Sequence, residues 1–304
     1  MSTPHAKVIV NPAAGASSTR RKWPRIERLL RDIGLSFDYE FTEGVGHGIE
    51  LARAAASEGY GCVVAVGGDG TVNEVANGIL LSTGASNTAL GVISTGTASD
   101  FARSAGIPRH YVSACAALTG SRRLLVDVGV MEYMSEGQSL RRYFVNAAGI
   151  GFDAAGCVTT ERLPKYFGGT VPYLVGILRT LFGWRNIPVV LRIGEKVEEA
   201  CIFSVVVCNG FAFGGGMKMA PEASLTDSLL DAVVIGDVGK LEVLWTLPKA
   251  YKGTHVTHPK ISVEKTANIT VEPSERLLVH ADGEVVGEGP VSFWVEPAAL
   301  SVIV

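Results

Sequence analysis

The chain has 304 residues and a formal net charge of −3, with 47% apolar and 19% charged residues. Dedicated nucleic-acid-binding proteins are normally basic, so this balance argues against a nucleic-acid partner. The length suits about two domains, each with its own buried core. Five cysteines are scattered and form no Cys-x-x-Cys pair. This predicts buried thiols in a reducing compartment, rather than disulfides or a zinc site.

Residues 6–125 alternate between strand-like and helix-like segments, which predicts a mostly parallel sheet covered by helices on both faces. The segments are recognised by β-branched apolar runs and by apolar residues at helical spacing. The expected strands are 6–10, 37–41, 62–66 and 90–93, and the expected helices are 23–33, 48–57, 72–81 and a short one after residue 100.

A polar turn follows each of these predicted strands. The carboxyl ends of parallel strands meet at one edge of the sheet, and ligands bind at that edge in open parallel sheets. Four polar turns that converge there predict a nucleotide-sized site. The turns are 11–15, 42–44, 67–74 and 96–100.

The turn Gly67–Glu74 carries the most polar groups, between a buried strand and a helix. Its glycines let the backbone approach a ligand closely, and the N–H groups of the first helical turn favour an anion such as phosphate. Thr71 and Glu74 match the capping box, Ser/Thr-x-x-Glu, which predicts that they cap this helix. The turn is neither a P-loop nor the G-x-G-x-x-G dinucleotide motif.

From about residue 124, strand-like runs dominate and only two helical stretches, near 171–184 and 239–251, interrupt them. This pattern predicts a β-sandwich-like second domain. We expect a nucleotide-binding α/β domain over 1–125 and a β-rich domain over 126–296, with residues 297–304 packing back on the first domain. The two apolar stretches 171–184 and 202–213 are too short to span a bilayer, and no signal-peptide core precedes residue 7. We therefore expect a cytoplasmic protein, at most peripheral to the membrane.

Three segments of the second half have two interpretations each. Residues 224–229 offer oxygen ligands suited to a hard cation, or form a polar turn. Asp282 and Glu284 place two acids on one turn, or belong to a plain hairpin. Residues 161–185 are apolar and aromatic with dispersed basic residues, so they form either a surface that meets a lipid or a helix packed on the sandwich.

Five motifs follow one another along the chain: Asn11-Pro12…Gly15, Gly67-Gly68-Asp69-Gly70-Thr71…Asn73-Glu74…Asn77-Gly78, Gly96-Thr97…Asp100-Phe101-Ala102-Arg103, Gly214-Gly215-Gly216-Met217…Pro221 and Asp282-Gly283-Glu284. In this combination and order they resemble the diacylglycerol kinase catalytic-domain family in its soluble bacterial lipid-kinase branch, which is also similar to sphingosine and ceramide kinases. The resemblance spans essentially the whole chain.

The resemblance implies an ATP-dependent kinase that transfers the γ-phosphate to a lipid hydroxyl such as that of diacylglycerol, with the nucleotide between the domains. It implies that Glu284 is the general base and that Asp69 orders an ATP-bound Mg²⁺ through water. A structural Mg²⁺ is implied at Ser224, Asp227 and Leu229. The implied nucleotide-binding residues are Asn11, Pro12, Ala13, Ala14, Gly15, Thr42, Gly67, Gly68, Asp69, Gly70, Thr71, Val72, Asn73, Glu74 and Thr97.

The chain departs from the family pattern at Ser94, Ser99 and Ser228, where the family commonly has Pro, Asn and Gly. These departures leave open a non-catalytic lipid- or nucleotide-binding regulator. An NAD kinase on the same scaffold also stays open, because it shares the Gly-Gly-Asp-Gly turn at 67–70. The identity of the lipid and a homo-oligomeric state also stay open. We expect peripheral membrane contact through basic and aromatic residues, namely Arg103, Lys165, Tyr166 and Arg179.

Overall fold

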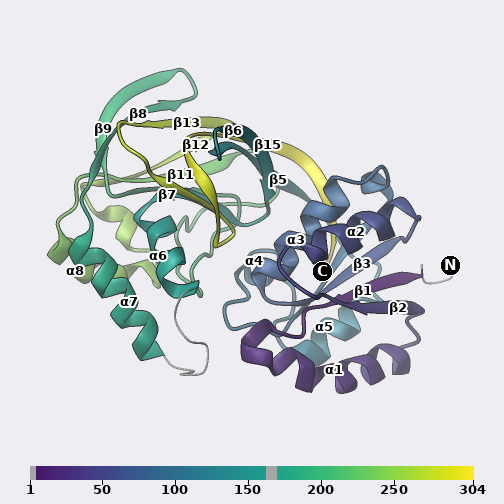
Figure 1. Cartoon of the computed structure of the whole chain (residues 1–304). Helices are drawn as coiled ribbons and strands as arrows, with labels where there is room; N and C mark the ends of the chain where they lie inside the picture. Colours follow the sequence, from purple (N-terminus) through teal and green to yellow (C-terminus); the bar gives the residue numbers. More distant parts are fainter. Residues whose placement is uncertain (1–4, 162–169) are drawn as a thin grey trace. The chain divides into compact units, whose positions relative to one another are not determined.

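The computed structural model describes residues 5–161 and 170–304, and divides into two compact units. Unit 1 runs to residue 128 and includes residues 297–304, and unit 2 comprises residues 129–296. Strands β5 (Arg123–Ser135) and β15 (Glu284–Ile303) each begin in one unit and end in the other. The expected fold class, an α/β domain followed by a β-rich domain, is confirmed (Figure 1).

Unit 1 is built on a parallel sheet with the order β2-β1-β3-β4, extended by the end of β15 beside β4. β1 and β3 are almost wholly buried, as expected for apolar runs in a sheet covered on both faces. The strands are β1 (Ala6–Val10), β2 (Phe37–Phe41), β3 (Cys62–Gly67) and β4 (Ala89–Ser94).

Helices cover both faces of this sheet (Figure 1). α1 (Ala14–Asp32) and α5 (Tyr111–Ala117) pack on one face, where Trp23, Ile26 and Leu30 at helical spacing join the core. α2 (His47–Ser57) and α3 (Asp69–Leu80) lie side by side on the other face. Two short elements complete the unit, α4 (Asp100–Ser104) and the 3-10 turn η1 (Ala85–Asn87).

Unit 2 is a β-sandwich with antiparallel pairing, as its many short strands predict. One layer runs β12-β11-β10-β7-β14-β15, and β13 pairs with β15 and β8, β8 with β9, and β5 with β6. Ile150, Val205, Leu191, Val271 and Phe293 meet in its apolar core. The strands are β6 (Gln138–Phe144), β7 (Ala147–Gly151), β8 (Ile187–Ile193), β9 (Lys196–Ile202), β10 (Ser204–Cys208), β11 (Leu230–Ile235), β12 (Ile261–Thr266), β13 (Asn268–Pro273) and β14 (Leu278–Ala281).

The helices of unit 2 are α6 (Phe152–Glu161), α7 (Thr170–Gly183) and α8 (Lys240–Ala250), with a 3-10 turn η2 (His255–Thr257). The sequence indicates α7 and α8 but not α6, because β-branched residues and a glycine give α6 a weak helical propensity. Among the described residues, no helix is both long and apolar enough to cross a membrane.

Candidate active site

Three turns of unit 1 are tied together at the carboxyl ends of their strands. The carbonyl of Gly67, the last residue of β3, accepts N–H bonds from Thr95 (2.8 Å) and Gly96 (3.2 Å) after β4. The Asn11 amide after β1 donates to Thr71 Oγ1 at 3.0 Å. The convergence predicted from parallel strands is therefore present, and it places backbone and small polar groups at one sheet edge.

The glycines of these turns are required for different reasons. A Cβ on Gly96 would lie 2.7 Å from the Gly68 Cα, and one on Gly67 would collide with the Thr71 side chain, so packing alone excludes larger residues there. Gly70 is exposed, its φ is not left-handed, and a Cβ there would meet nothing within 4 Å. Neither packing nor backbone conformation requires glycine at position 70, so a ligand that approaches the backbone accounts for it best.

Gly70→Ala and Gly96→Ala are therefore expected to separate ligand binding from folding. Gly70→Ala should leave the melting temperature unchanged or slightly higher, since alanine favours a helix over glycine by up to about 1 kcal/mol, while the KM for ATP rises. Gly96→Ala should lower both stability and ATP affinity. Thermal unfolding and ATP titration of the two variants check this, and an unchanged KM in Gly70→Ala would contradict it.

The turn after β1 continues into a left-handed segment at the start of α1. Gly15, Ala16 and Ser17 have φ values of 59°, 52° and 65°. Two of these residues are not glycine, and such backbone strain clusters at ligand-binding sites. A Cβ on Gly15 would approach the Thr95 carbonyl oxygen to 2.6 Å, so this turn packs against the turn after β4. Pro12, Ala13 and Ala14 lie in the same bend.

The two threonines of the expected site follow β2 and β4. Thr42 is buried, and its N–H donates to the Val10 carbonyl at 2.9 Å. Thr97 is exposed in the turn before α4. Both therefore lie after the carboxyl end of a parallel strand, as the sequence predicts.

Asp69 is the first residue of α3, and its carboxylate accepts the Phe101 N–H of α4 at 3.1 Å. It therefore also holds the turn after β4. Within that turn Ser99 has φ 55°, a left-handed conformation that asparagine adopts more readily. Val72 and Asn73 are buried in the first turns of α3.

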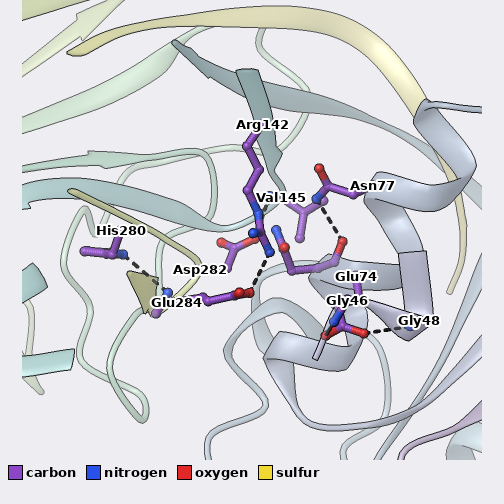
Figure 2. A network of polar contacts seen from close by, with 11 residues as sticks. Gly46, Gly48, Glu74, Asn77, Arg142, Val145, His280, Asp282 and Glu284 are labelled. Carbon is purple, nitrogen blue, oxygen red and sulfur yellow. Dashed lines mark hydrogen bonds and ion pairs between the residues drawn. The ribbon is translucent and has the colours of Figure 1, made fainter. Parts of the chain in front are cut away.

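Glu74 does not cap its own helix, so the predicted capping box is wrong. The helix begins at Asp69, which leaves Thr71 inside it. The Glu74 carboxylate instead accepts N–H bonds from Gly46 and Gly48, both at 2.9 Å, at the start of α2 (Figure 2). A negative charge is favourable at a helix N-terminus, so Glu74 fixes α2 against α3 rather than extending toward a phosphate.

In unit 2, Asp282 anchors the turn that carries Glu284. Its carboxylate accepts backbone N–H bonds from Val145 (2.9 Å), Asn146 (3.0 Å) and Ala147 (2.8 Å) (Figure 2). Asp282 and Gly283 have φ values of 48° and 89°. The turn is thus bound to the start of β7, which gives Glu284 a fixed backbone position.

Glu284 is paired with Arg142 of β6, at 2.6 Å between Nη2 and Oε2 (Figure 2). The Arg142 side chain is 15% exposed and that of Glu284 is 31% exposed. The carboxylate is therefore oriented by a cation and still open to solvent. Sequence reasoning missed Arg142, since it lies 142 residues away and belongs to no local motif.

A second polar network lies behind this turn and was also missed. His280 is fully buried, with Nε2 2.8 Å from Asp153 Oδ2 and Nδ1 3.3 Å from the Gly283 nitrogen. The Ser204 hydroxyl donates to the other Asp153 oxygen at 2.5 Å. The Phe213 ring stacks on His280, with centroids 5.1 Å apart. These contacts support the 282–284 turn from inside the sandwich.

The expected structural metal site is occupied by a lysine. Lys265 Nζ lies 2.6 Å from Asp227 Oδ2 and 3.4 Å from the Glu222 carbonyl oxygen, and Asp227 Oδ1 accepts the Leu229 N–H at 3.2 Å. Ser224 Oγ lies 3.3 Å from Thr226 Oγ1. An ammonium and a divalent cation at the same carboxylate repel each other, so this donor set does not fit Mg²⁺ while Lys265 is in place.

Two further observations bear on that loop. Ser228 has φ 61°, the left-handed conformation that glycine adopts without strain. Burial raises the pKa of Asp231 to about 6, beside Lys265 at 4.0 Å. In the described part of the chain, no group of three His, Cys, Asp or Glu side chains is arranged to hold a metal ion.

Lys265→Met is expected to make thermal stability depend on Mg²⁺, whereas we expect no such dependence of stability in the wild type. Removing the ammonium leaves the Asp227 carboxylate without its cation, so Mg²⁺ at tenfold its dissociation constant should stabilise the variant by about 1.4 kcal/mol. Thermal unfolding with and without Mg²⁺ measures this. Lys260→Met, which removes an exposed partner of Glu242, is the matched control. Equal stabilisation of wild type and Lys265→Met would contradict the prediction.

The residues expected to contact a membrane are not all described. Lys165 and Tyr166 lie outside the described residues. Arg103 of unit 1 is half-buried, 3.9 Å from Asp100, and Arg179 of unit 2 is exposed. Membrane contact through these residues stays a prediction.

The comparisons with known proteins agree with the described fold. Residues 5–131 match the diacylglycerol kinase catalytic domain, and residues 146–304 match the YegS C-terminal NAD kinase beta sandwich-like domain. A diacylglycerol kinase of Staphylococcus carnosus (strain TM300) is 27% identical over 290 residues, which cover 95% of this chain and 91% of that protein.

Solved structures share the fold. A diacylglycerol kinase from Bacillus anthracis str. Sterne superposes with a TM-score of 0.74 at 22% identity, covering 100% of this chain and 97% of that one. Yeast NADH kinase complexed with NADH reaches a TM-score of 0.51 at 10% identity, covering 99% and 83%. The scaffold is thus shared with a dinucleotide kinase, but the likeness is more distant.

Proposed function

Because the chain belongs to the diacylglycerol kinase family, whose members use ATP to phosphorylate a lipid hydroxyl, we propose that its acceptor is diacylglycerol. The observation that carries the proposed mechanism is the Glu284 carboxylate. It is fixed by Asp282 through the turn, oriented by Arg142, and remains open to solvent. A carboxylate held in this way suits the removal of a proton from an alcohol.

We propose that the turns of unit 1 bind the phosphates of ATP. The backbone around Gly68 and Gly70, with Thr97 and the left-handed segment at Gly15, offers N–H and hydroxyl groups for phosphate oxygens. Gly70 supports this, since neither packing nor backbone conformation requires a glycine there. The proposed set keeps the residues expected from the sequence, with Glu74 as a support for α2 rather than a phosphate ligand.

In the proposed reaction Glu284 accepts the hydroxyl proton of the lipid as the hydroxyl oxygen bonds to the γ-phosphorus of ATP. The bond between that phosphorus and the β,γ-bridging oxygen breaks, and ADP leaves with the bridging oxygen. Phosphoryl transfer depends mainly on positioning and charge neutralisation, so the geometry of the turns matters more than any nucleophile of the protein.

Mg²⁺ enters this proposal with ATP. Asp69 is the acid of the unit 1 turn, and its carboxylate is suited to order the waters of a nucleotide-bound Mg²⁺, which supplies charge neutralisation. The Asp227 site is not part of the proposed reaction, because Lys265 supplies a positive charge there.

The test is the transfer of labelled phosphate from ATP with Mg²⁺ to a panel of acceptors in mixed micelles. The panel holds diacylglycerol, a sphingoid base, phosphatidylglycerol and an undecaprenol-like alcohol, with NAD as the control for the dinucleotide alternative. We expect labelled phosphatidic acid. Labelled NADP, or labelling of another lipid instead, would overturn diacylglycerol as the acceptor. ATP binding without any labelled product would favour the regulator.

A further inference from the structure

Helix α8 of unit 2 exposes an apolar face that the sandwich does not use. Leu241, Trp245 and Pro248 are spaced by four and three residues, so they share one side of the helix, and all three are exposed. Leu241 is 70% exposed and Trp245 is 79% exposed. Trp245 is more exposed than any other Trp, Tyr or Phe that the structure describes.

The opposite side of α8 already provides its packing. Val243 and Leu244 pack against the buried cluster of Leu181, Phe203 and Val238. A helix that is apolar on both sides needs a partner for the side that its own domain leaves open. The end of α7 is bonded to the start of α8, where the Phe182 carbonyl accepts a bond from Lys240, and the Phe182 side chain is 58% exposed.

The charges around this face are positive. Lys240, Lys249 and Lys252 are exposed at the two ends of α8, whereas the nearby Glu242 is paired with Lys260 at 2.8 Å. Residues 239–253 hold three lysines and one glutamate, a net charge of +2 in a chain whose net charge is −3. The net charge of this segment is therefore opposite in sign to that of the whole chain, and it complements an anionic surface.

We propose that the α8 face, formed by Leu241, Trp245 and Pro248, docks on an anionic lipid bilayer. Tryptophan prefers the boundary between headgroups and acyl chains, and lysines flanking it attract anionic headgroups while their stems lie along apolar surface. Such a helix lies in the interface plane. The proposal deepens the proposed function, since a kinase for diacylglycerol must reach a substrate held in a bilayer.

The test is co-sedimentation of the full chain with vesicles of phosphatidylcholine alone or mixed with phosphatidylglycerol. The vesicles contain no diacylglycerol and the assay no ATP, so binding is scored independently of the proposed reaction. We expect binding to the mixed vesicles only, weakened by added salt, with a blue shift of tryptophan emission that Trp245→Phe removes.

The double variant Leu241→Ser/Trp245→Ser is expected to reduce this binding by about tenfold or more. The reason is that two large apolar side chains no longer enter the lipid interface, so the free energy of burying them is lost. Val197→Ser is the matched control, because Val197 is 56% exposed on β9 of the same unit and lies outside the α8 face. Melting temperatures monitor folding in each variant.

Unchanged binding in the double variant, an equal loss in Val197→Ser, or equal binding to neutral vesicles would each overturn the proposal. A wild-type dimer that the double variant dissociates, with no vesicle binding, would assign the face to self-association instead.

Discussion

Glu284→Gln is expected to lower kcat by about 10²–10⁴-fold, the usual contribution of a general base, while the melting temperature and ATP binding stay near those of the wild type. Glutamine keeps the size of the side chain and an oxygen that accepts from Arg142, but it does not take a proton from an alcohol. Steady-state turnover with diacylglycerol in mixed micelles, alongside ATP titration, measures both quantities.

Arg142→Met is the companion variant, because it keeps the Glu284 carboxylate and removes the cation that orients it. Its loss of kcat should be smaller than that of Glu284→Gln and larger than its effect on the KM for ATP, because it misorients the carboxylate without removing it. Near-normal turnover in Glu284→Gln would remove Glu284 from the mechanism, whatever Arg142→Met does.

Asp282→Ala is expected to lower the free energy of unfolding by about 3 kcal/mol or more and to reduce kcat strongly. Three backbone N–H groups lose a charged acceptor, and each buried donor left unpaired costs about 1–3 kcal/mol. The turn that positions Glu284 then loses its anchor to the start of β7. Urea unfolding and turnover measurements give the two effects.

Asp282→Gly separates the two causes of the lost stability, which are the missing carboxylate contacts and the backbone strain of alanine in a left-handed conformation. Both substitutions remove the carboxylate, but glycine adopts φ 48° without the strain that alanine suffers, a difference of about 1–2 kcal/mol. We expect Asp282→Gly to be more stable than Asp282→Ala and still far less active than the wild type. Wild-type turnover in Asp282→Gly would show that the carboxylate contacts do not position Glu284.

The parallel sheet of unit 1 could be predicted because its information is local. β1 and β3 are short β-branched runs, and each is followed by a polar turn and a helical repeat. The strand ends then place the turns at one edge by topology alone. The helix α6 of unit 2 could not be predicted, because its residues form no strong apolar repeat at helical spacing.

Long-range polar contacts could not be predicted from the same patterns. Thr71 and Glu74 fit a capping box, yet the carboxylate contacts residues 26 and 28 positions earlier, because α2 offers two free N–H groups at its start. Lys265 reaches Asp227 from β12, and no rule of spacing indicates that pair. The left-handed φ of Ser99 and Ser228, by contrast, accords with the asparagine and glycine common at these positions in the family.

The return of β15 to unit 1 has a consequence for folding during synthesis. Ser301 and Val302 pair with Ala89 and Leu90 of β4, so the sheet of unit 1 includes a strand that is synthesised after unit 2. Domains of most proteins fold in the order in which they leave the ribosome. Here the first unit emerges with one edge of β4 unpaired. The strand that covers this edge, the end of β15, follows only after the whole of unit 2 has been translated. A ribosome stalled before residue 297 should therefore hold a unit 1 that a protease cleaves more readily than the released chain.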